Sequence, residues 1–379
     1  MSQLNDLFTP SLVLDRTKLE RNIKRMSAHI NALGVDLRPH VKTSKSAEVS
    51  RLAAAAHSGA ITVSTLEEAR YFADAGFKDI LYAVGIVPSK LPQVVALQEK
   101  SVTIKVVLDD LANAHEVANW AADNGCMISV LIEIDSDGQR AGLDPDDGDI
   151  DAIARLLNDA VSTRFMGLMT HAGESYNCRT EDELRAMAKQ ERDAVVMVAK
   201  RLADAGVPCP IVSVGSTPTA LFAENLDGIT EVRAGIYTFM DLYQEGLGCC
   251  ALDDIALSVL TSVIGHKMKQ NWMLVDAGGL ALSKDHGRAP AADDRGYGLV
   301  MSGDGKTVYD NLIVKGVNQE HGMIMTVDGR PIDFSAFPIG ARLRILPNHA
   351  CMTAAAYDRY HVVDGGEDVV AEWSRTNGW

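Results

Sequence analysis

The sequence lacks any continuous apolar run close to the ~20 residues that a membrane-spanning helix needs. Its N-terminal segment, MSQLNDLFTP, also lacks the basic and apolar regions of a secretory signal peptide. We therefore expect a cytoplasmic protein with no membrane partner.

Cysteine and positive charge are also scarce. The six cysteines, at positions 126, 178, 209, 249, 250 and 351, are irregularly spaced and form no CxxC pair. This excludes the disulfide framework of a small secreted domain and predicts that most of them are buried thiols. The 36 Lys and Arg residues are outnumbered by 51 Asp and Glu residues, which gives a net charge of −15. Because nucleic acids are bound through clustered Lys and Arg, no nucleic-acid partner is expected, whereas a few arginines in a pocket could still bind an anionic substrate.

What the sequence does contain is a series of short runs rich in Val, Ile and Leu, each followed by a stretch of helical periodicity. Nearly continuous apolar runs are typical of parallel strands that are buried on both faces. Their alternation with helices over roughly 240 residues predicts an α/β fold, a (β/α)₈ TIM-type barrel, although an open sheet fits the same pattern. The eight runs are residues 36–43, 59–65, 79–85, 103–110, 127–135, 165–173, 210–217 and 231–238.

The first of the expected helices follows Asp15, which is a plausible N-cap. Its apolar residues are spaced by four and three positions and so form one stripe that faces a core. They are Leu19, Ile23, Met26, Ile30 and Leu33.

After about Asp254 the pattern changes to strand-like runs separated by Gly, Asp and Asn, at residues 258–265, 272–276 and 342–346. This pattern predicts a second, mostly β domain, and the early run at residues 11–15 is expected to pair into its sheet. The predicted domains are residues 15–250 for the barrel, and residues 1–14 plus 251–379 for the β domain.

The segment RPHVKTSK places Lys42 and Lys45 at the C-terminal end of the first predicted strand, where barrel active sites are built. A desolvated lysine has a lowered pKa, and its free amine can attack an aldehyde. From this segment alone, two lysines that extend into solvent from a strand end are the simpler interpretation.

The segment nevertheless resembles the cofactor-lysine motif of the fold-type III pyridoxal-phosphate (PLP) enzymes, in the D-serine dehydratase and D-threonine aldolase branch that is distantly similar to alanine racemase. The resemblance extends over nearly the whole chain through the motifs IEIDSDGQRAG, THAGESY, VSVGSTPT, EVRAGIY, VDAG, NQEHG and LPNHAC. It implies that Lys42, rather than Lys45, carries PLP as a Schiff base and that His40 and Arg140 lie at the cofactor. Arg140 matches the family arginine that approaches the cofactor ring.

Two further strand ends are predicted to complete the cofactor site. Ser216 and Thr217 follow the seventh strand and open a helix with Thr217 as a plausible N-cap, and barrel phosphate sites recur after strands seven and eight. Gly235, Ile236 and Tyr237 would join them around the phosphate. The alternative is a capped helix without a ligand. His171 and Tyr176 follow the sixth strand and could line the cofactor pocket, with the imidazole acting on a substrate proton near neutral pH.

The last predicted site is a metal pair formed by His349 and Cys351. On extended backbone, residues i and i+2 face the same way at roughly 6.5–7 Å, so imidazole and thiolate could bind one ion, and this donor set favours zinc. The pattern alone is weak, and a core cysteine beside a surface histidine is its alternative interpretation. The dehydratase members of the family resemble this chain in using a His-x-Cys pair for zinc, whereas aldolase members typically have Asp at the second position and prefer harder cations such as Mn²⁺ or Mg²⁺.

The resemblance therefore predicts a PLP- and zinc-dependent dehydratase that converts a β-hydroxy D-amino acid, such as D-threo-3-hydroxyaspartate or D-serine, to a 2-oxo acid and ammonia. An aldolase giving glycine and an aldehyde is the alternative. A non-enzymatic PLP carrier would resemble the barrel alone and would have no use for an open metal site. Arg288 and Arg295 are candidates for binding a second substrate carboxylate, and a homodimer is expected.

Overall fold

The computed structural model describes residues 3–286 and 294–379, which form two compact units. One unit contains residues 25–235 together with the C-terminal residues 376–379, and the other contains residues 1–24 and 236–375. The domain boundaries predicted from the sequence were 15–250 for the barrel and 1–14 plus 251–379 for the β domain. They remain a prediction, because this division into units does not test them.

The first unit is built on an eight-stranded parallel sheet with the strand order β2-β9-β8-β7-β6-β5-β4-β3. An isolated parallel bridge between His40 and Thr62 joins the two ends of this order, so the sheet curves into a barrel. The prediction of a TIM-like α/β barrel is confirmed. The strands are β2 (Asp36–Leu37), β3 (Ile61–Val63), β4 (Asp79–Gly85), β5 (Thr103–Leu108), β6 (Ile128–Ile134), β7 (Thr163–Thr170), β8 (Ile211–Val214) and β9 (Glu231–Val232).

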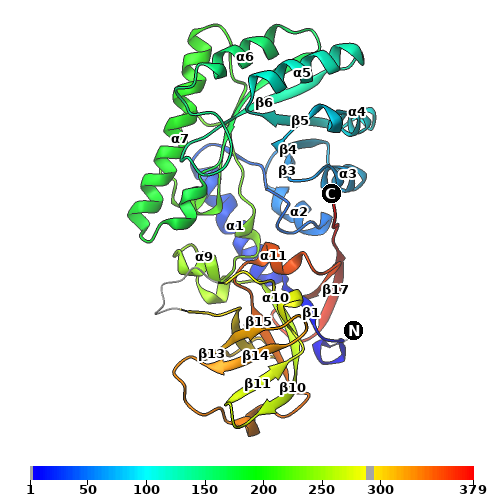
Figure 1. The fold of residues 1–379 in the computed structure, drawn as a ribbon, viewed down its shortest axis with the longest axis vertical. Helices are drawn as coiled ribbons and strands as arrows, with labels where there is room; N and C mark the ends of the chain where they lie inside the picture. The colour runs from blue at the N-terminus through cyan, green and yellow to red at the C-terminus, as the bar shows by residue number, and fades with distance from the viewer. Residues whose placement is uncertain (1–2, 287–293) are drawn as a thin grey trace. The chain divides into compact units, whose positions relative to one another are not determined.

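Helices cover the outer side of these strands, as Figure 1 shows for α4, α5 and α7. Apart from Thr103, every residue of β5 is buried, as expected of a strand covered on both faces. The helices are α2 (Ala47–Ala54), α3 (Leu66–Asp74), α4 (Leu91–Glu99), α5 (Leu111–Asp123), α6 (Asp149–Asp159), α7 (Glu181–Asp204) and α8 (Thr217–Phe222), with short 3₁₀ turns η2 (Pro88–Lys90) and η3 (Gly173–Asn177).

The first predicted helix is α1 (Arg16–Ala32), and Asp15 caps it as expected, because its Oδ1 accepts the Lys18 N–H at 3.2 Å. The predicted apolar stripe is buried at its first four positions, and Leu33, which lies just beyond the last helical turn, is only half-buried.

The second unit is mostly β, as predicted. The nine strands that the structure describes in this unit follow the order β11-β14-β13-β12-β15-β10-β1-β16-β17, and a further pairing of β11 with β10 closes six of them into a ring. The early strand β1 pairs with β10 and β16, which confirms the expected role of residues 11–15. The strands are β1 (Ser11–Asp15), β10 (Leu257–Lys267), β11 (Trp272–Val275), β12 (Leu299–Ser302), β13 (Val308–Val317), β14 (Gly322–Thr326), β15 (Arg342–Leu346), β16 (Arg359–Val363) and β17 (Val369–Ser374).

Short helical segments connect the strands of this second unit. They are α9 (Leu242–Gly246), α10 (Gly279–Leu282) and α11 (Ala350–Ala354), with the 3₁₀ turns η1 (Leu4–Asp6), η4 (Ile236–Thr238), η5 (Leu252–Asp254) and η7 (Phe334–Ala336). Within the described residues, no helix is both long and apolar enough to cross a membrane.

All six cysteines are free thiols, but only Cys178 and Cys249 are buried. The expectation that most of them are buried was therefore wrong. The other four lie in turns or at the ends of helices and strands, where part of the side chain stays in contact with water.

The barrel contains an ion-pair network near the start of the strands, built on the buried residues Arg38, Lys105 and Glu231 and the half-exposed Asp79. Arg38 pairs with Glu231 at 2.8 Å and with Asp79 at 2.6 Å, and Lys105 pairs with Asp79 at 2.7 Å. Asp79 and Glu231 are the first residues of their strands. Arg38 therefore serves this network at the start of the strands, away from the C-terminal end where Lys42 and Lys45 were predicted.

Close packing between β7 and β8 depends on Gly167, whose φ is +124°. A Cβ at this position would collide with the backbone of Ile211. We expect Gly167→Ala to lower the free energy of unfolding by about 3 kcal/mol or more, because it adds this collision to backbone strain. Gly206→Ala is the matched control, because its φ is +84° but open space surrounds it, so only strain of about 1 kcal/mol applies. Urea unfolding measures both, and equal losses would contradict the packing argument.

Candidate active site

Lys42 lies in a turn at residues 41–44 that follows the barrel-closing bridge. His40 N–H donates to Ala234 O at 2.8 Å and Val41 N–H donates to Thr62 O at 2.9 Å, so both neighbouring strands fix the start of this turn. The predicted strand 36–43 was too long, since the regular strand ends at Leu37 and Lys42 is outside it. Lys42 is half-buried.

Lys45, the competing lysine, already has a buried partner. Its Nζ lies 3.2 Å from Oε1 of Glu68, a residue of α3 that is 1 % exposed. Its carbonyl oxygen accepts the N–H of Thr376 at 2.9 Å, and the C-terminus lies beside α2 and α3 in Figure 1. This ion pair holds the Lys45 amine at the buried carboxylate, which favours Lys42 as the reactive lysine.

Two imidazoles lie within electrostatic reach of Lys42. Desolvation and then the charges of Lys42 and Arg140 lower the pKa of His171 to about 3, and burial followed by the charge of Lys42 lowers the pKa of His40 well below its usual value. Both rings are therefore neutral near pH 7. His171 follows β7, and its Nδ1 lies 2.7 Å from Gly215 O. Because a carbonyl can only accept, Nδ1 has the proton and Nε2 has the lone pair.

Tyr176 and Arg140 are near His171. Tyr176 lies in η3, and its ring centroid is 6.4 Å from the ring centroid of His171. Arg140 lies in the loop after β6, is exposed, and has its Nη2 at 3.7 Å from Oε1 of the buried Glu133. Burial raises the pKa of Glu133, and the charges of Arg140 and Arg233 oppose that shift.

The predicted phosphate-binding residues divide between the two units. Ser216 and Thr217 are buried at the start of α8, but the N-cap is Ser216 rather than Thr217, because Ser216 Oγ accepts the Thr219 N–H at 3.2 Å. Gly235 lies in the barrel unit, where a Cβ would come within 2.6 Å of His40 O. The predicted strand 231–238 ends at Val232, and Ile236 and Tyr237 instead begin η4 in the other unit.

His349 and Cys351 interact through their side chains, but the predicted extended geometry was wrong. His349 is the N-cap of α11 and Cys351 lies within that helix, so a helix start rather than a strand brings them together. Burial lowers the pKa of His349, but the hydrogen bond and charge of Cys351, with Asp241 and Asp285, together raise it to about 10. The surroundings of this imidazole therefore favour positive charge.

Sequence reasoning missed the two carboxylates beside this pair. Asp285 Oδ2 lies 2.6 Å from His349 Nδ1, and Asp241 Oδ2 accepts the Ala350 N–H at 2.9 Å, which fixes the start of α11. Asp285 is 64 positions from His349 and Asp241 is 109 positions from Ala350, so no spacing pattern could reveal these contacts.

Two arginines were candidates for a second substrate carboxylate. Arg288 lies outside the described residues. Arg295 lies 3.7 Å from Glu245, and the next residue, Gly296, accepts a hydrogen bond from the Asn348 side chain at 2.7 Å. Asn348 immediately precedes His349, so Arg295 belongs to the surroundings of the proposed metal pair.

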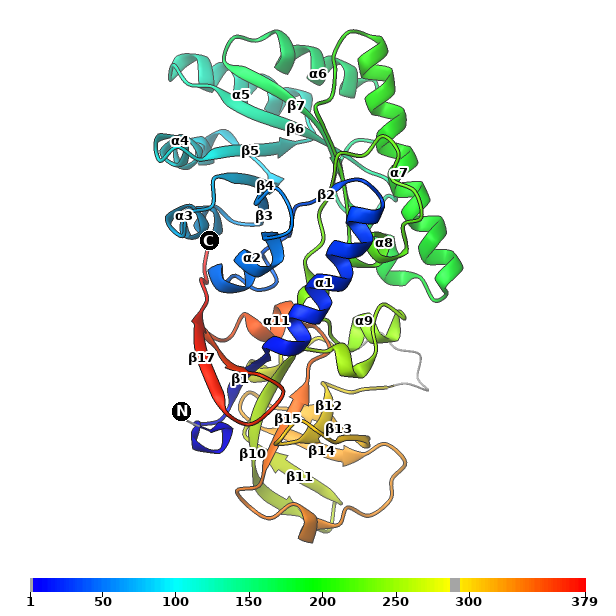
Figure 2. The same cartoon turned by 180° about the vertical axis from the view of Figure 1, so that it is seen from behind.

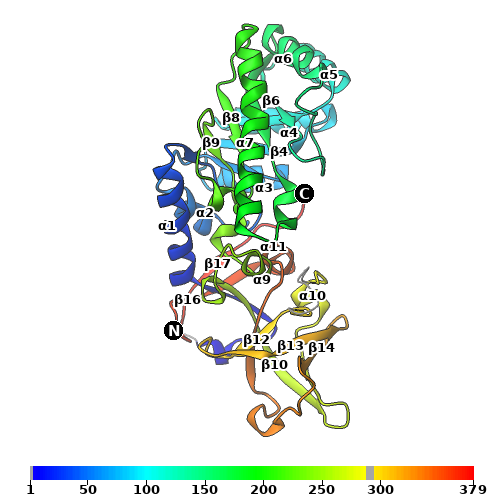
Figure 3. The ribbon, with the colours of Figure 1, turned by 90° about the vertical axis from the view of Figure 1, so that its left-hand side faces the viewer.

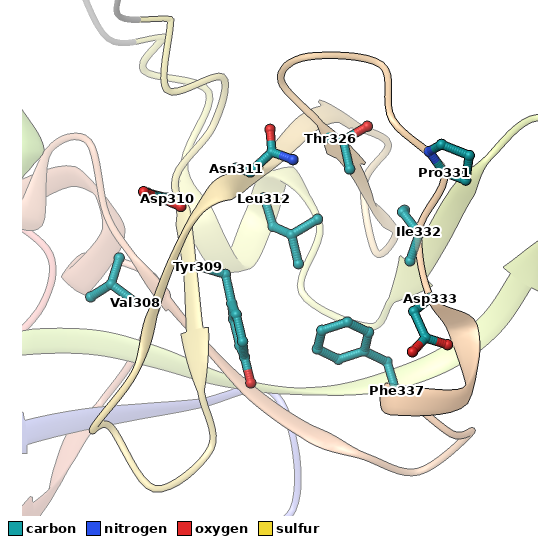
Figure 4. A pocket seen from close by; sticks show the side chains of 10 residues that line it. All are labelled: Val308, Tyr309, Asp310, Asn311, Leu312, Thr326, Pro331, Ile332, Asp333 and Phe337. Atoms are coloured by element: carbon teal, nitrogen blue, oxygen red, sulfur yellow. The ribbon is translucent and has the colours of Figure 1, made fainter.

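A cavity of about 290 Å³ lies elsewhere in the β unit, between β13, β14 and the segment that contains η7. Figure 4 shows its aromatic side, formed by Tyr309 and Phe337, and its rim with Asp310 and Asp333. It contains none of the predicted site residues. Across residues 3–286 and 294–379, no group of three or more His, Cys, Asp or Glu side chains is placed to hold one metal ion.

Two family models match the chain: the alanine racemase N-terminal domain over residues 14–242 and the serine dehydratase domain over residues 256–363. The D-threo-3-hydroxyaspartate dehydratase of Delftia sp. (strain HT23) is 47 % identical over 98 % of both chains. The chain belongs to the D-serine dehydratase and D-threonine aldolase family.

Other relatives include both kinds of enzyme. The D-serine dehydratase of Dictyostelium discoideum is 32 % identical over 99 % of this chain and 98 % of its own, and the D-threonine aldolase of an Arthrobacter species is 29 % identical over 95 % and 91 %. The solved structure of the Delftia enzyme matches this one with a TM-score of 0.96 at 46 % identity over the full length of both chains. A cysteine-to-alanine variant of that enzyme, in the metal-free form, matches equally well. The chain is thus an enzyme, and its dehydratase relatives are carbon–oxygen lyases.

The lowered pKa of His171 predicts that its ring stays neutral from pH 8 to pH 5. In the unfolded chain it takes up a proton near its ordinary pKa of ~6.5. The unfolded state then binds more protons, so the free energy of unfolding should fall as the pH drops below ~6.5, by up to about 1.4 kcal/mol per pH unit from this group. His40 contributes with the same sign.

Nitrogen NMR of the imidazole rings follows this titration directly. His171→Gln should show a shallower loss of stability between pH 6.5 and pH 4 than the wild type. A His171 ring that titrates near pH 6.5 in the folded protein would contradict the assignment.

Proposed function

We propose that the protein is a PLP- and metal-dependent dehydratase that converts a β-hydroxy D-amino acid, such as D-threo-3-hydroxyaspartate or D-serine, to a 2-oxo acid and ammonia. The main support is its 47 % identity to the Delftia dehydratase along the whole chain, together with a cysteine in the metal pair. Thiolate and imidazole suit zinc better than Mn²⁺ or Mg²⁺.

The residues of the barrel fit PLP. Lys42 is half-buried beside two neutral imidazoles, and the buried Nδ1 atom of His40 has no hydrogen-bond partner within the described part of the chain. A buried polar atom of this kind is costly unless a ligand or water satisfies it. Ser216 and Thr217 would hold the phosphate at the start of α8, together with Gly235 of the same unit. Arg140 would approach the ring.

The residues of the β unit fit a metal ion. With His349 Nδ1 bonded to Asp285, Nε2 is left as the metal-binding nitrogen, and a carboxylate behind a ligating histidine is the usual arrangement. Cys351 supplies a thiolate. Two protein ligands leave positions for water and the substrate hydroxyl, as in a catalytic site.

In the proposed reaction, bound PLP would withdraw electrons from Cα of the substrate, and the metal would make the β-hydroxyl a better leaving group. Lys42 Nζ, as a neutral amine, would take the proton from Cα. His171 has too low a pKa to be an efficient base near pH 7, so we assign its Nε2 the role of a hydrogen-bond acceptor at the cofactor or substrate. Loss of the Cα–H and Cβ–O bonds releases water, and the enamine product hydrolyses to the oxo acid and ammonia.

The aldolase alternative differs in which bond breaks. A base would take the proton of the β-hydroxyl and the Cα–Cβ bond would break. Cα would then take up a proton, so the products would be glycine and an aldehyde. The Arthrobacter aldolase shows that the family includes this chemistry.

Cys351→Ala should lose the metal and at least 100-fold of the 2-oxo-acid production while it keeps PLP. The Cys351 thiolate is the soft ligand of the proposed metal pair, and Cys351 is not among the barrel residues proposed to bind PLP. Metal analysis, cofactor absorbance and product chromatography measure the three effects. Cys126→Ala is the control, since this thiol is far from His349 in sequence and lies in the other unit.

The proposal predicts ammonia and oxo acid from the wild type. Glycine and aldehyde would instead establish the aldolase reaction. Full dehydration by a metal-free Cys351→Ala variant would show that the thiol has no catalytic role.

A further inference from the structure

Glu191 is a buried carboxylate that the proposed reaction does not use. It lies on α7, the long helix drawn in front of the barrel strands in Figure 3. This helix packs against α8, which is beside it in Figure 2. The residue is 2 % exposed, and burial raises the pKa of its carboxyl group. Burying a carboxylate is costly unless it is hydrogen-bonded.

One oxygen of Glu191 joins the loops that follow two neighbouring strands. Its Oε1 accepts the Ala172 N–H at 2.9 Å, after β7, and the Gly215 N–H at 3.0 Å, after β8. The Thr219 hydroxyl also hydrogen-bonds to the carboxylate.

The same two loops contain the functional groups of the barrel. Ala172 follows His171, and Gly215 precedes Ser216, the N-cap of α8. His171 Nδ1–H donates to Gly215 O at 2.7 Å, and Ser175 Oγ lies 2.9 Å from Ser216 Oγ. Glu191 thus holds the N–H group that follows His171 and the N–H group of Gly215, the two residues that this hydrogen bond joins.

Arg233 fixes the same strand ends independently. Its guanidinium donates to Ser213 Oγ and to Thr170 O, each at 2.6 Å. Burial lowers the pKa of Arg233, and the charges of Glu231 and Glu191 oppose that shift. Gly215 allows the close approach, since its φ is +141° and a Cβ there would collide with Arg233 O.

We propose that Glu191 is a positioning residue that holds the ring of His171 and the phosphate-binding start of α8 in register with each other. This inference rests on the proposed function, because it assigns the start of α8 to the PLP phosphate. Without an acceptor at position 191, two buried N–H groups lose their partner and the two loops can shift apart.

The test compares binding of PLP and of pyridoxal, which lacks the phosphate, to cofactor-free enzyme. Glu191→Gln keeps an acceptor oxygen, and its amide N–H can donate to Thr219 Oγ1. Glu191→Leu removes the acceptor at similar volume. Glu191→Asp keeps the charge but is one methylene too short to reach both N–H groups, and it decides the test if the Leu variant does not fold. Val195→Ala, which removes buried volume one turn along α7, is the control for a general loss of stability.

We expect Glu191→Leu and Glu191→Asp to bind PLP at least tenfold more weakly, with a much smaller change for pyridoxal, while Glu191→Gln stays within about threefold of the wild type. Val195→Ala should lower the melting temperature and leave the PLP-to-pyridoxal affinity ratio unchanged. The phosphorus NMR signal of bound PLP should shift in the Asp and Leu variants alone.

Wild-type PLP affinity in the Asp and Leu variants, or an equal loss for PLP and pyridoxal, would overturn the positioning role. Failure of the wild type itself to bind PLP would instead overturn the proposed function.

Discussion

The barrel unit depends on the closure of its parallel sheet by the short segment around His40. This segment bonds to Ala234 on one side and to Thr62 on the other, so the first strand is held between the last and the second. Gly235 has no Cβ, and this lets the backbone after β9 lie close to His40 O, because a Cβ would come within 2.6 Å of that oxygen. Closure therefore places the turn with Lys42 at the strand ends, where barrel enzymes bind their ligands.

Charge is distributed unequally along the barrel. At the start of the strands, Arg38, Lys105, Asp79 and Glu231 pair with one another, so their charges are compensated. Beyond the strand ends, burial and then the positive charge of Lys42 lower the pKa values of His40 and His171 and keep both rings neutral. Paired charges at one end serve stability, whereas neutral imidazoles at the other end are available to accept hydrogen bonds. Barrels commonly separate stability from function in this way.

The architecture could be predicted from the sequence because it follows from local patterns. Buried apolar runs alternate with helical stripes, and β15 and the cap at Asp15 match their predicted positions. The predicted first and last barrel strands were too long, because apolar residues continue past Leu37 and Val232 into turns that are also buried. Burial and strand conformation are separate properties, and the apolar pattern of a sequence indicates burial but not where a strand ends.

The candidate site was predictable mainly through family motifs. Glu191, Asp241 and Asp285 escaped sequence reasoning, since each acts through a partner that is distant in the chain or through backbone N–H groups that no sequence motif displays. The extended geometry assumed for His349 and Cys351 failed because a helix begins at Ala350, and Asp241 stabilises that helix start from another segment.

The central claim is that barrel closure makes Lys42 the cofactor lysine. Borohydride reduction of the protein with PLP, followed by peptide mapping, tests it most directly. The account predicts one pyridoxyl label on Lys42, none on Lys45, and no stable label in Lys42→Ala. A label on Lys45, or an unchanged label in Lys42→Ala, would contradict it.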